Sequence, residues 1–347
     1  MTSGQRAAYR FRPAVKRHAQ GGGKMRIDVH AHYFPFEYLD RLDKYGAHEI
    51  TEPLRRHQFG YMGSKEPEAL KARFAMMDRA KIDLQVLSLS YQLPYFANRE
   101  HAVDAARFGN DLYAQIVREH PKRFAAFAGT PLPHIEASND EMHRALDELG
   151  MVGVTATTSV MGKSIADTMF DGFFQELNRR KAVLFIHPAG VSAGSALIDE
   201  YKLTWPIGAP LEDTTCLLQM LQARIPARFP DVKIILPHLG GFAPFLTQRL
   251  DQLRMMYFPP EEPAPSKLAR HFYYDTVNGY PPALRCACEA FGSDHIVLGT
   301  DYPFWRDDAF QLAAEFVEKA GLPQDEVEHI LGGTAEGMLG LKRAVAR

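Results

Sequence analysis

Cysteine is scarce in this chain of 347 residues, which contains only Cys216, Cys286 and Cys288. Three cysteines cannot all pair, and the Cys-x-Cys spacing of the last two is poor geometry for a disulfide. A disulfide-stabilised scaffold is therefore excluded. A reducing, cytoplasmic setting is the simplest prediction.

The chain also has no excess charge and no long apolar run. Lys and Arg number 40 and Asp and Glu 42, a net charge of −2, so nothing predicts a nucleic-acid partner. No apolar stretch approaches the roughly 20 residues that a membrane span needs, so no membrane partner is predicted either. A composition that is 46% hydrophobic and 24% charged is typical of a soluble globular protein.

The first 24 residues contain no acidic residue and end in three glycines, Gly21–Gly23. They lack the apolar segment of a secretory signal. An organelle transit peptide is an alternative, but the segment has little serine and no clear amphipathic face. We therefore expect a disordered basic leader over residues 1–24 on which no function depends. The prediction for residues 25–347 is a single folded domain.

From Met25 onward, short apolar runs alternate with longer, charged, helical stretches. The alternation predicts parallel strands covered by helices. Eight such units over about 300 residues favour a (β/α)8 TIM barrel of the α/β class. A dinucleotide-binding fold would need a glycine-rich turn after its first strand, where His30-Ala31-His32-Tyr33 stands instead. The predicted strands cover residues 25–32, 83–90, 124–132, 152–158, 182–189, 232–239, 272–277 and 295–302.

Ionisable residues stand where four of these runs end. His30 and His32 close the first run, His187 the fifth, His238 the sixth and Asp301 the eighth. In a TIM barrel these ends converge on one mouth, where active sites lie. Each residue alone has an ordinary structural explanation, such as a core histidine or a turn-forming aspartate. Their coincidence at strand ends favours a functional site.

The His-x-His spacing suits a metal ion, because alternate strand residues share a face. A third imidazole and a carboxylate from the opposite side would complete a set of three nitrogens and one oxygen. Such a set suits Zn²⁺ well, with Mn²⁺, Fe²⁺ and Co²⁺ as alternatives. We therefore expect one divalent ion in each chain.

These motifs resemble the amidohydrolase superfamily, and specifically its aminocarboxymuconate-semialdehyde decarboxylase branch. The matching segments are Ile-Asp-Val-His-Ala-His-Tyr-Phe-Pro at 27–35, His187-Pro188, His-Leu-Gly-Gly at 238–241 and Gly-Thr-Asp-Tyr-Pro-Phe at 299–304. The resemblance covers about residues 25–340. It implies a TIM barrel of the metal-dependent hydrolase type and, commonly, a homodimer.

The resemblance also implies roles for the strand-end residues. His30, His32, His187 and Asp301 would be metal ligands and His238 the acid/base residue, with Asp301 counted among the catalytic residues as well. Hydrolytic relatives often bridge two metals through a lysine on the fourth strand, but residues 152–158 contain none. Relatives that favour Mn²⁺ replace the first histidine by glutamate, so His30 points to Zn²⁺.

The predicted function is a metal-dependent, non-oxidative decarboxylase of a small unsaturated or aromatic carboxylic acid, a carboxy-lyase. The metal would act as Lewis acid and template, and His238 would manage the proton delivered to the carbon that loses CO2. Nearby arginines are candidates for binding a second carboxylate, although a solvated position is expected for each of them: Arg55, Arg56 and Arg73. Aromatic candidates for the mouth are Phe34, Phe36, Tyr91, Tyr95, Trp205, Phe304 and Trp305.

Two alternatives remain open. The same residues would serve a mononuclear metal-dependent hydrolase of a lactone or amide, in which the ion activates water. A barrel without catalysis, acting as a binding module, is the third alternative. It would require a broken metal set, and no member of the set is missing.

Overall fold

The computed structural model describes residues 25–277 and 279–341, so the expected leader over residues 1–24 lies outside the described residues. Eight strands form one parallel sheet in the order β1-β2-β3-β4-β7-β8-β9-β10. Each strand falls within one of the eight predicted runs. The strands are β1 (Ile27–His32), β2 (Leu84–Ser88), β3 (Phe124–Gly129), β4 (Gly153–Thr157), β7 (Val183–His187), β8 (Lys233–Leu236), β9 (Tyr273–Asp275) and β10 (Ile296–Val297).

The sheet closes on itself where the chain after β10 meets β1. The amide of Val29 donates to the carbonyl of Leu298 at 2.9 Å, and the amide of Asp301 donates to the carbonyl of His30 at 2.7 Å. Ala31 and Tyr302 form a parallel bridge further along. The predicted TIM barrel is confirmed, and its closure places Asp301 beside the histidines of β1.

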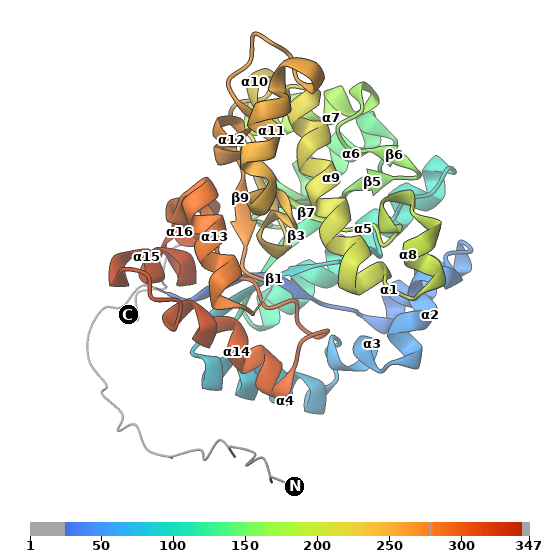
Figure 1. The fold of residues 1–347 in the computed structure, drawn as a ribbon. Coiled ribbons are helices and arrows are strands. Elements are labelled where there is room, and N and C mark those ends of the chain that lie inside the picture. The colour runs from blue at the N-terminus through green and yellow to red at the C-terminus, as the bar shows by residue number, and fades with distance from the viewer. Residues whose placement is uncertain (1–24, 278, 342–347) are drawn as a thin grey trace, which may run out of the picture.

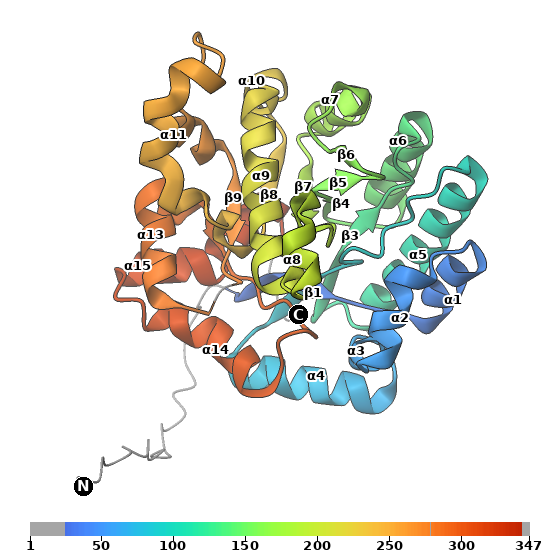
Figure 2. The same ribbon diagram turned by 45° about the vertical axis from the view of Figure 1, so that its right-hand side comes forward.

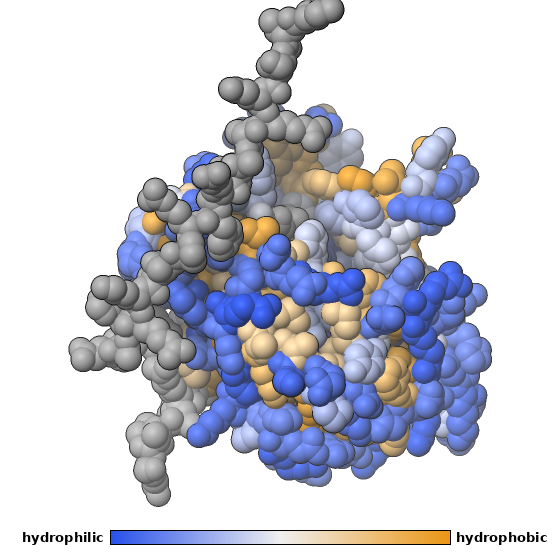
Figure 3. Space-filling view, turned by 90° about the horizontal axis from the view of Figure 1, so that it is seen from below, coloured by the Kyte–Doolittle hydropathy of each residue, from blue (hydrophilic) through white to orange (hydrophobic). Residues whose placement is uncertain are grey.

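Helices surround the strands in a ring (Figures 1 and 2). One helix follows each strand in the chain, as expected for parallel strands joined by crossovers. The eight are α4 (Pro67–Ala80), α5 (Arg99–Glu119), α6 (Ile135–His143), α7 (Asp171–Arg180), α9 (Ala209–Gln222), α11 (Ala243–Tyr257), α13 (Pro281–Phe291) and α14 (Asp307–Glu318), with α4 preceding β2. Hydrophilic side chains cover most of the face seen from below (Figure 3).

The core has two parts, because alternate strand residues point to opposite faces. The larger cluster joins outward-facing strand residues, such as Leu87 and Ile186, to the helices. A smaller cluster takes inward-facing residues from six strands, including Val29, Phe127 and Phe185. The rings of Phe127 and Phe185 stack at 5.5 Å. These side chains fill the barrel interior beneath the site.

Two long segments that follow strands contain short helices of their own. The segment after β1 holds α1 (Phe36–Lys44), α2 (His48–Arg56) and α3 (Phe59–Met62). The segment after β7 holds α8 (Ala196–Glu200) and the π-helix η4 (Thr204–Gly208) before α9 begins at Ala209. Both segments follow strands at the carboxyl end of the barrel. Secondary structure in them gives the mouth a defined wall.

Further short elements lie outside the predicted pattern. A two-stranded hairpin, β5 (Ser159–Val160) and β6 (Lys163–Ser164), follows β4. The remaining short α-helices of the described residues are α10 (Ile225–Arg228), α12 (Pro265–Leu268), α15 (Gln324–Glu328) and α16 (Thr334–Leu339). The π-helix η8 (His329–Gly333), directly before α16, packs so closely on the residues preceding β1 that a Cβ at Gly332 would lie 1.7 Å from the carbonyl oxygen of Met25. Within the described residues, no helix combines the length and apolarity that a membrane crossing requires.

Candidate metal and active site

A local irregularity in β1 turns its histidines toward the centre of the barrel. The pairing register between β1 and β2 shifts between Asp28 and Ala31. Val29 faces the inner cluster, and His30, the next residue, also faces inward. Such bulges re-aim a side chain at the cost of one unpaired residue. After the bulge the strand alternates normally, so His30 and His32 share the inner face, as predicted.

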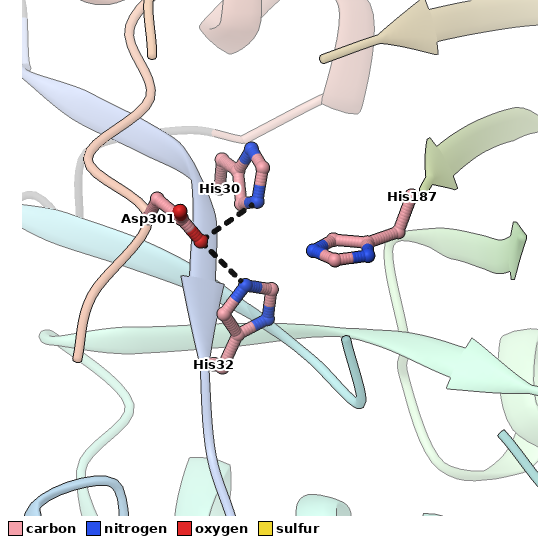
Figure 4. A group of neighbouring side chains, drawn as sticks. All are labelled: His30, His32, His187 and Asp301. Atoms are coloured by element: carbon pink, nitrogen blue, oxygen red, sulfur yellow. Dashed lines mark hydrogen bonds and ion pairs between the residues drawn. The ribbon is translucent and has the colours of Figure 1, made fainter. Parts of the chain in front are cut away.

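All four predicted ligands, three histidines and one carboxylate, meet at the mouth (Figure 4). One candidate ligand atom from each of His30, His32, His187 and Asp301 lies within 4.8 Å of the others. Asp301 Oδ1 lies 3.2 Å from His30 Nε2 and 3.0 Å from His32 Nε2. His187 approaches from the opposite side of the barrel, with its ring 5.0 Å from that of His32. Strands far apart in the sequence thus supply one cluster.

Each histidine is held by its Nδ1 atom, which leaves Nε2 turned toward the cluster. His30 Nδ1 bonds to Asp275 Oδ2 at 2.7 Å, His32 Nδ1 to Ser88 Oγ at 3.0 Å and His187 Nδ1 to the carbonyl of Pro188 at 2.9 Å. Protein metal sites fix imidazole ligands in this way, because the outer partner selects the tautomer and the ring orientation. The donor set therefore fits a divalent ion.

Buried charge in the cluster also favours a cation at its centre. Burial by itself would lower the pKa of His30, but Asp275 and Asp301 outweigh it and raise that pKa to about 10. Burial lowers the pKa of His32 to about 4 and that of His187 well below its ordinary value. Burial opposes ionisation of Asp301, yet the two histidines of β1 hold its pKa well below the usual range. The two carboxylates thus stabilise positive charge where a metal ion would sit.

His238 lies beside this cluster but belongs to a different set of contacts. It begins a 3-10 turn, η5 (His238–Gly240), directly after β8. Its Nδ1 atom lies 2.8 Å from Oδ2 of Asp213, on α9, and its ring centroid lies 5.6 Å from that of His30. Its backbone φ of 53° and that of Asp301, 59°, lie in the left-handed region, which costs non-glycine residues energy. Such strain is typical of functional positions.

The electrostatics of the His238–Asp213 pair place the shared proton on the imidazole. Burial would lower the pKa of His238, but Asp213 more than compensates and raises it above the ordinary histidine value. Burial raises the pKa of Asp213 to about 6, against the opposing effect of the imidazole. A carboxyl group with that pKa is ionised at neutral pH, so Asp213 accepts the hydrogen bond and His238 donates it.

Arg73 is not solvated, contrary to expectation, but is 1% exposed behind β1. Its Nε donates to Gln85 Oε1 at 2.7 Å and its NH1 donates to the carbonyl of His32 at 2.9 Å. Gln85 in turn donates to Asp28 at 2.7 Å. Arg73 is buried because helix α4 packs its apolar face against the barrel. The local sequence pattern does not indicate this burial. The guanidinium supports the strand that carries two of the histidines.

Aromatic side chains line the approach to the cluster. The ring of Phe304 lies 5.5 Å from that of His32, and Phe34 stacks on His32 at 5.9 Å. Tyr91 lies 6.5 Å from His187 and contacts Trp205, from η4, at 5.0 Å. Arg55 and Arg56 lie elsewhere, in surface ion pairs with acidic residues of α1 and α2. The mouth is therefore mainly aromatic.

Two carboxylates that contact the predicted site residues were not identified from the sequence, Asp275 and Asp213. Asp275 lies within a predicted strand, and a carboxylate inside an apolar run is a signal, because burying one requires partners. Asp213 lies on helix α9, where an acidic residue usually faces solvent. No sequence signal distinguishes it.

A family model described as amidohydrolase (Amidohydro_2) matches residues 27–341. The chain belongs to the amidohydrolase family. The resemblance seen in its motifs is thereby confirmed, and the match spans all eight strands of the barrel.

Several relatives of this amidohydrolase are decarboxylases. It is 28% identical over 337 residues to 2-amino-3-carboxymuconate-6-semialdehyde decarboxylase of Dictyostelium discoideum, covering 91% of this chain and 92% of the relative. It is 26% identical to gamma-resorcylate decarboxylase of Polaromonas sp., covering 85% of this chain and 97% of the relative. A crystal structure of dihydroxybenzoic acid decarboxylase from Polaromonas sp., with bound manganese and 2-nitroresorcinol, superposes with a TM-score of 0.77 at 22% identity, covering 93% of this chain and 98% of that one.

Proposed function

We propose that this amidohydrolase is a metal-dependent, non-oxidative decarboxylase of a small aromatic or unsaturated carboxylic acid. The observation that carries the proposal is the cluster of His30, His32, His187 and Asp301, with His238 alongside. The decarboxylase relatives support the reaction type, and their names supply the class of substrate.

The four clustered residues would hold one divalent ion, with Asp301 serving catalysis through that ion. When bound, the ion would supply Lewis-acid polarisation and a fixed point for the substrate carboxylate. We propose Zn²⁺, because three imidazoles and one carboxylate are a donor set that zinc favours. The manganese bound in the related decarboxylase makes Mn²⁺ the principal alternative.

His238 would act as the general acid. Its Nε2–H delivers a proton to the ring or vinyl carbon that bears the carboxylate, and the bond from that carbon to the carboxylate then breaks. The electron pair of the broken bond restores the conjugated system, CO2 leaves, and His238 regains a proton from solvent. Phe304 and Tyr91 would confine a flat substrate between the metal site and the mouth. The net reaction consumes one proton for each CO2 released.

Isotope labelling tests this reaction directly. The purified protein, loaded with Zn²⁺ or Mn²⁺, is incubated with a panel of hydroxybenzoic and unsaturated carboxylic acids in D2O and, separately, in H2¹⁸O. Decarboxylation releases CO2 and leaves one deuterium at the vacated carbon. A lactone and an amide are included as controls for hydrolysis. Ring opening with ¹⁸O in the product, and no CO2 from any acid, would contradict the proposal in favour of a hydrolase.

We also propose a homodimer, supported by unusual apolar exposure near the mouth. Helix α8 has no buried residue, and within α11 only Ala243 and Pro244 are buried. Large side chains are exposed on these two helices and the residues beside them, namely Leu197, Tyr201, Trp205, Ile207, Phe242 and Phe245. Apolar patches of this kind mark association surfaces. The second copy would cover this face.

Light scattering after size-exclusion chromatography tests the dimer. The substitution Phe245→Ser should shift the protein toward the monomer, because this side chain is 84% exposed. Met161→Ser, at an exposed position in the β5–β6 turn, is the matched control. A monomeric wild-type protein would contradict the proposal.

We also propose a cytoplasmic location, because the three cysteines, Cys216, Cys286 and Cys288, are free. Cell fractionation tests this location.

A further inference from the structure

Two adjacent buried carboxylates in the first turns of α9 reach different parts of the mouth. Glu212 accepts hydrogen bonds from the amides of Ala189 and Val191, both at 2.7 Å, in the segment after β7. Asp213 contacts His238, after β8, at 2.8 Å. Consecutive helical residues point about 100° apart, so one helix turn serves both segments. The two residues nevertheless have different kinds of partner.

Glu212 has the contacts of a structural residue, whereas Asp213 does not. Besides the two amides, Glu212 accepts a hydrogen bond from Thr158 Oγ1 at 2.9 Å, so its carboxylate joins three elements. Asp213 caps no helix. Its Oδ1 atom is buried with no hydrogen-bond partner among the described residues. Burying a carboxylate is costly, and the imidazole of His238 is the partner that offsets this cost.

Other contacts already fix the backbone around His238. Its amide donates to Asp275 Oδ1 at 2.9 Å. The amide of Phe242 donates to Thr214 Oγ1 at 2.8 Å. A Cβ at Gly241 would lie 2.0 Å from the carbonyl oxygen of Pro210, so the turn after β8 packs directly on the start of α9. These contacts hold the turn without the side chain of Asp213. The carboxylate of Asp213 therefore acts on the imidazole ring of His238 and not on the backbone of the turn.

We propose that Asp213 is a positioning residue that acts through His238. It accepts the Nδ1–H hydrogen bond, orients the imidazole, and thereby makes Nε2 the nitrogen that carries and releases the catalytic proton. The inference rests on the proposed role of His238 as general acid. A carboxylate behind a catalytic histidine serves in this way in hydrolases of unrelated fold, where it holds the tautomer and stabilises the imidazolium.

The isosteric substitution Asp213→Asn tests the role, because it removes the charge and keeps the volume. We expect kcat to fall by about 10²- to 10³-fold, within the range of a misdirected proton-transfer group, while KM changes by less than about twofold. Metal content should stay at the wild-type level, since Asp213 is not in the ligand cluster. Glu141→Gln is the matched control, because Glu141 is a buried carboxylate that bonds to Asn110 and Arg144, away from the mouth. The control should keep wild-type kcat.

A double-mutant cycle separates positioning from general stability. In the His238→Asn background, Asp213→Asn should lower kcat no further, because the group through which it acts is gone. Additive losses in the double variant, or a wild-type kcat in Asp213→Asn, would overturn the inference. If His238→Asn itself keeps full kcat, the proposed function of His238 fails instead.

A spectroscopic measurement gives an independent answer. In ¹⁵N-histidine-labelled protein, the signals of His238 are identified by their loss in His238→Asn. Wild type should show a protonated Nδ1 throughout the accessible pH range, and Asp213→Asn should show a mixture of tautomers. Unchanged nitrogen shifts in Asp213→Asn would contradict the positioning role, whatever the effect of the substitution on stability.

Discussion

Asp275 joins His30 to the turn that carries His238. Its Oδ2 atom bonds to His30 Nδ1 at 2.7 Å, and its Oδ1 atom accepts the amide hydrogen of His238 at 2.9 Å. The side chain is fully buried. One carboxylate therefore sets the distance between the proposed metal site and the proposed general acid. Because both contacts come from one rigid group, displacing either residue affects the other.

The first prediction concerns this link. Asp275→Asn should weaken metal binding by about 10- to 100-fold, the usual effect of losing a carboxylate behind a histidine ligand. The loss in kcat should remain when metal is added to saturation, because the amide of His238 has also lost its charged acceptor. Metal titration followed by steady-state kinetics measures both effects. Full recovery of kcat at saturating metal would show that Asp275 serves His30 alone.

Metal content provides the second prediction. Purified protein should hold about one divalent ion per chain, with zinc preferred when no metal is added. His187→Ala should lower metal affinity sharply without unfolding the barrel, because the inner apolar cluster beneath the site does not include His187. Elemental analysis and circular dichroism provide the two measurements. Two ions per chain, or none under metal-replete conditions, would contradict a mononuclear site.

The third prediction separates His238 from the ligands. His238→Ala should keep its metal, while turnover falls by about 10²- to 10⁴-fold. His238→Asn should be nearly as impaired, because its amide does not transfer a proton at neutral pH. A histidine with a purely structural role would give a different result, namely a loss of about 1–3 kcal/mol in the free energy of unfolding at normal turnover. Metal content, melting temperature and turnover should therefore be measured on one preparation. Loss of metal would make His238 a ligand.

The pH profile extends this prediction. Among the described residues, Asp213, Asp275 and His30 face His238, and Asp213 raises the pKa of the imidazole above its ordinary value against the opposing effect of burial. A general acid is active when protonated, so kcat should fall as pH rises through that pKa, above the usual value of about 6.5. Asp213→Asn should move this descending limb to lower pH. A limb that stays in place in the Asn variant would assign the titration to another group.

Arg73 is the subject of the fourth prediction. Arg73→Met should lower the free energy of unfolding by about 1–3 kcal/mol for each of the two buried acceptors that it leaves without a donor, Gln85 Oε1 and the carbonyl of His32. Denaturant unfolding measures the loss. Arg79→Met, at an exposed position on the same helix, is the control and should change stability by less than about 0.5 kcal/mol. Equal stability of the two variants would show that Arg73 contributes nothing to the barrel wall.

The fifth prediction concerns residues 1–24, for which we propose a dispensable leader preceding a single folded domain. Deleting them should leave kcat and the melting temperature unchanged, because the segment has no apolar pattern with which to pack. Thermal unfolding and steady-state kinetics of the truncated and full chains provide the comparison. A substantial loss of either property would show that the segment contacts the barrel or a second copy of it.

The amino-acid sequence by itself determined the barrel and the positions of the candidate ligands. Its apolar runs have the length and spacing of parallel strands, and residues at the carboxyl ends of such strands meet at one mouth. The sequence alone therefore groups the four candidate ligands, His30, His32, His187 and Asp301. The alternation of β1 predicted two inward histidines as well, since period and burial are local properties.

Only the tertiary structure decided which residues support that site. Asp213 and Arg73 lie on helices, and whether a helical charge is buried depends on how the helix rotates as it packs on the barrel. The register shift in β1, which turns His30 inward directly after Val29, arises from pairing with β2. Contacts such as Asp213 to His238 join residues distant in sequence. Local spacing carries no information about them, because they form only when the barrel closes and its helices pack.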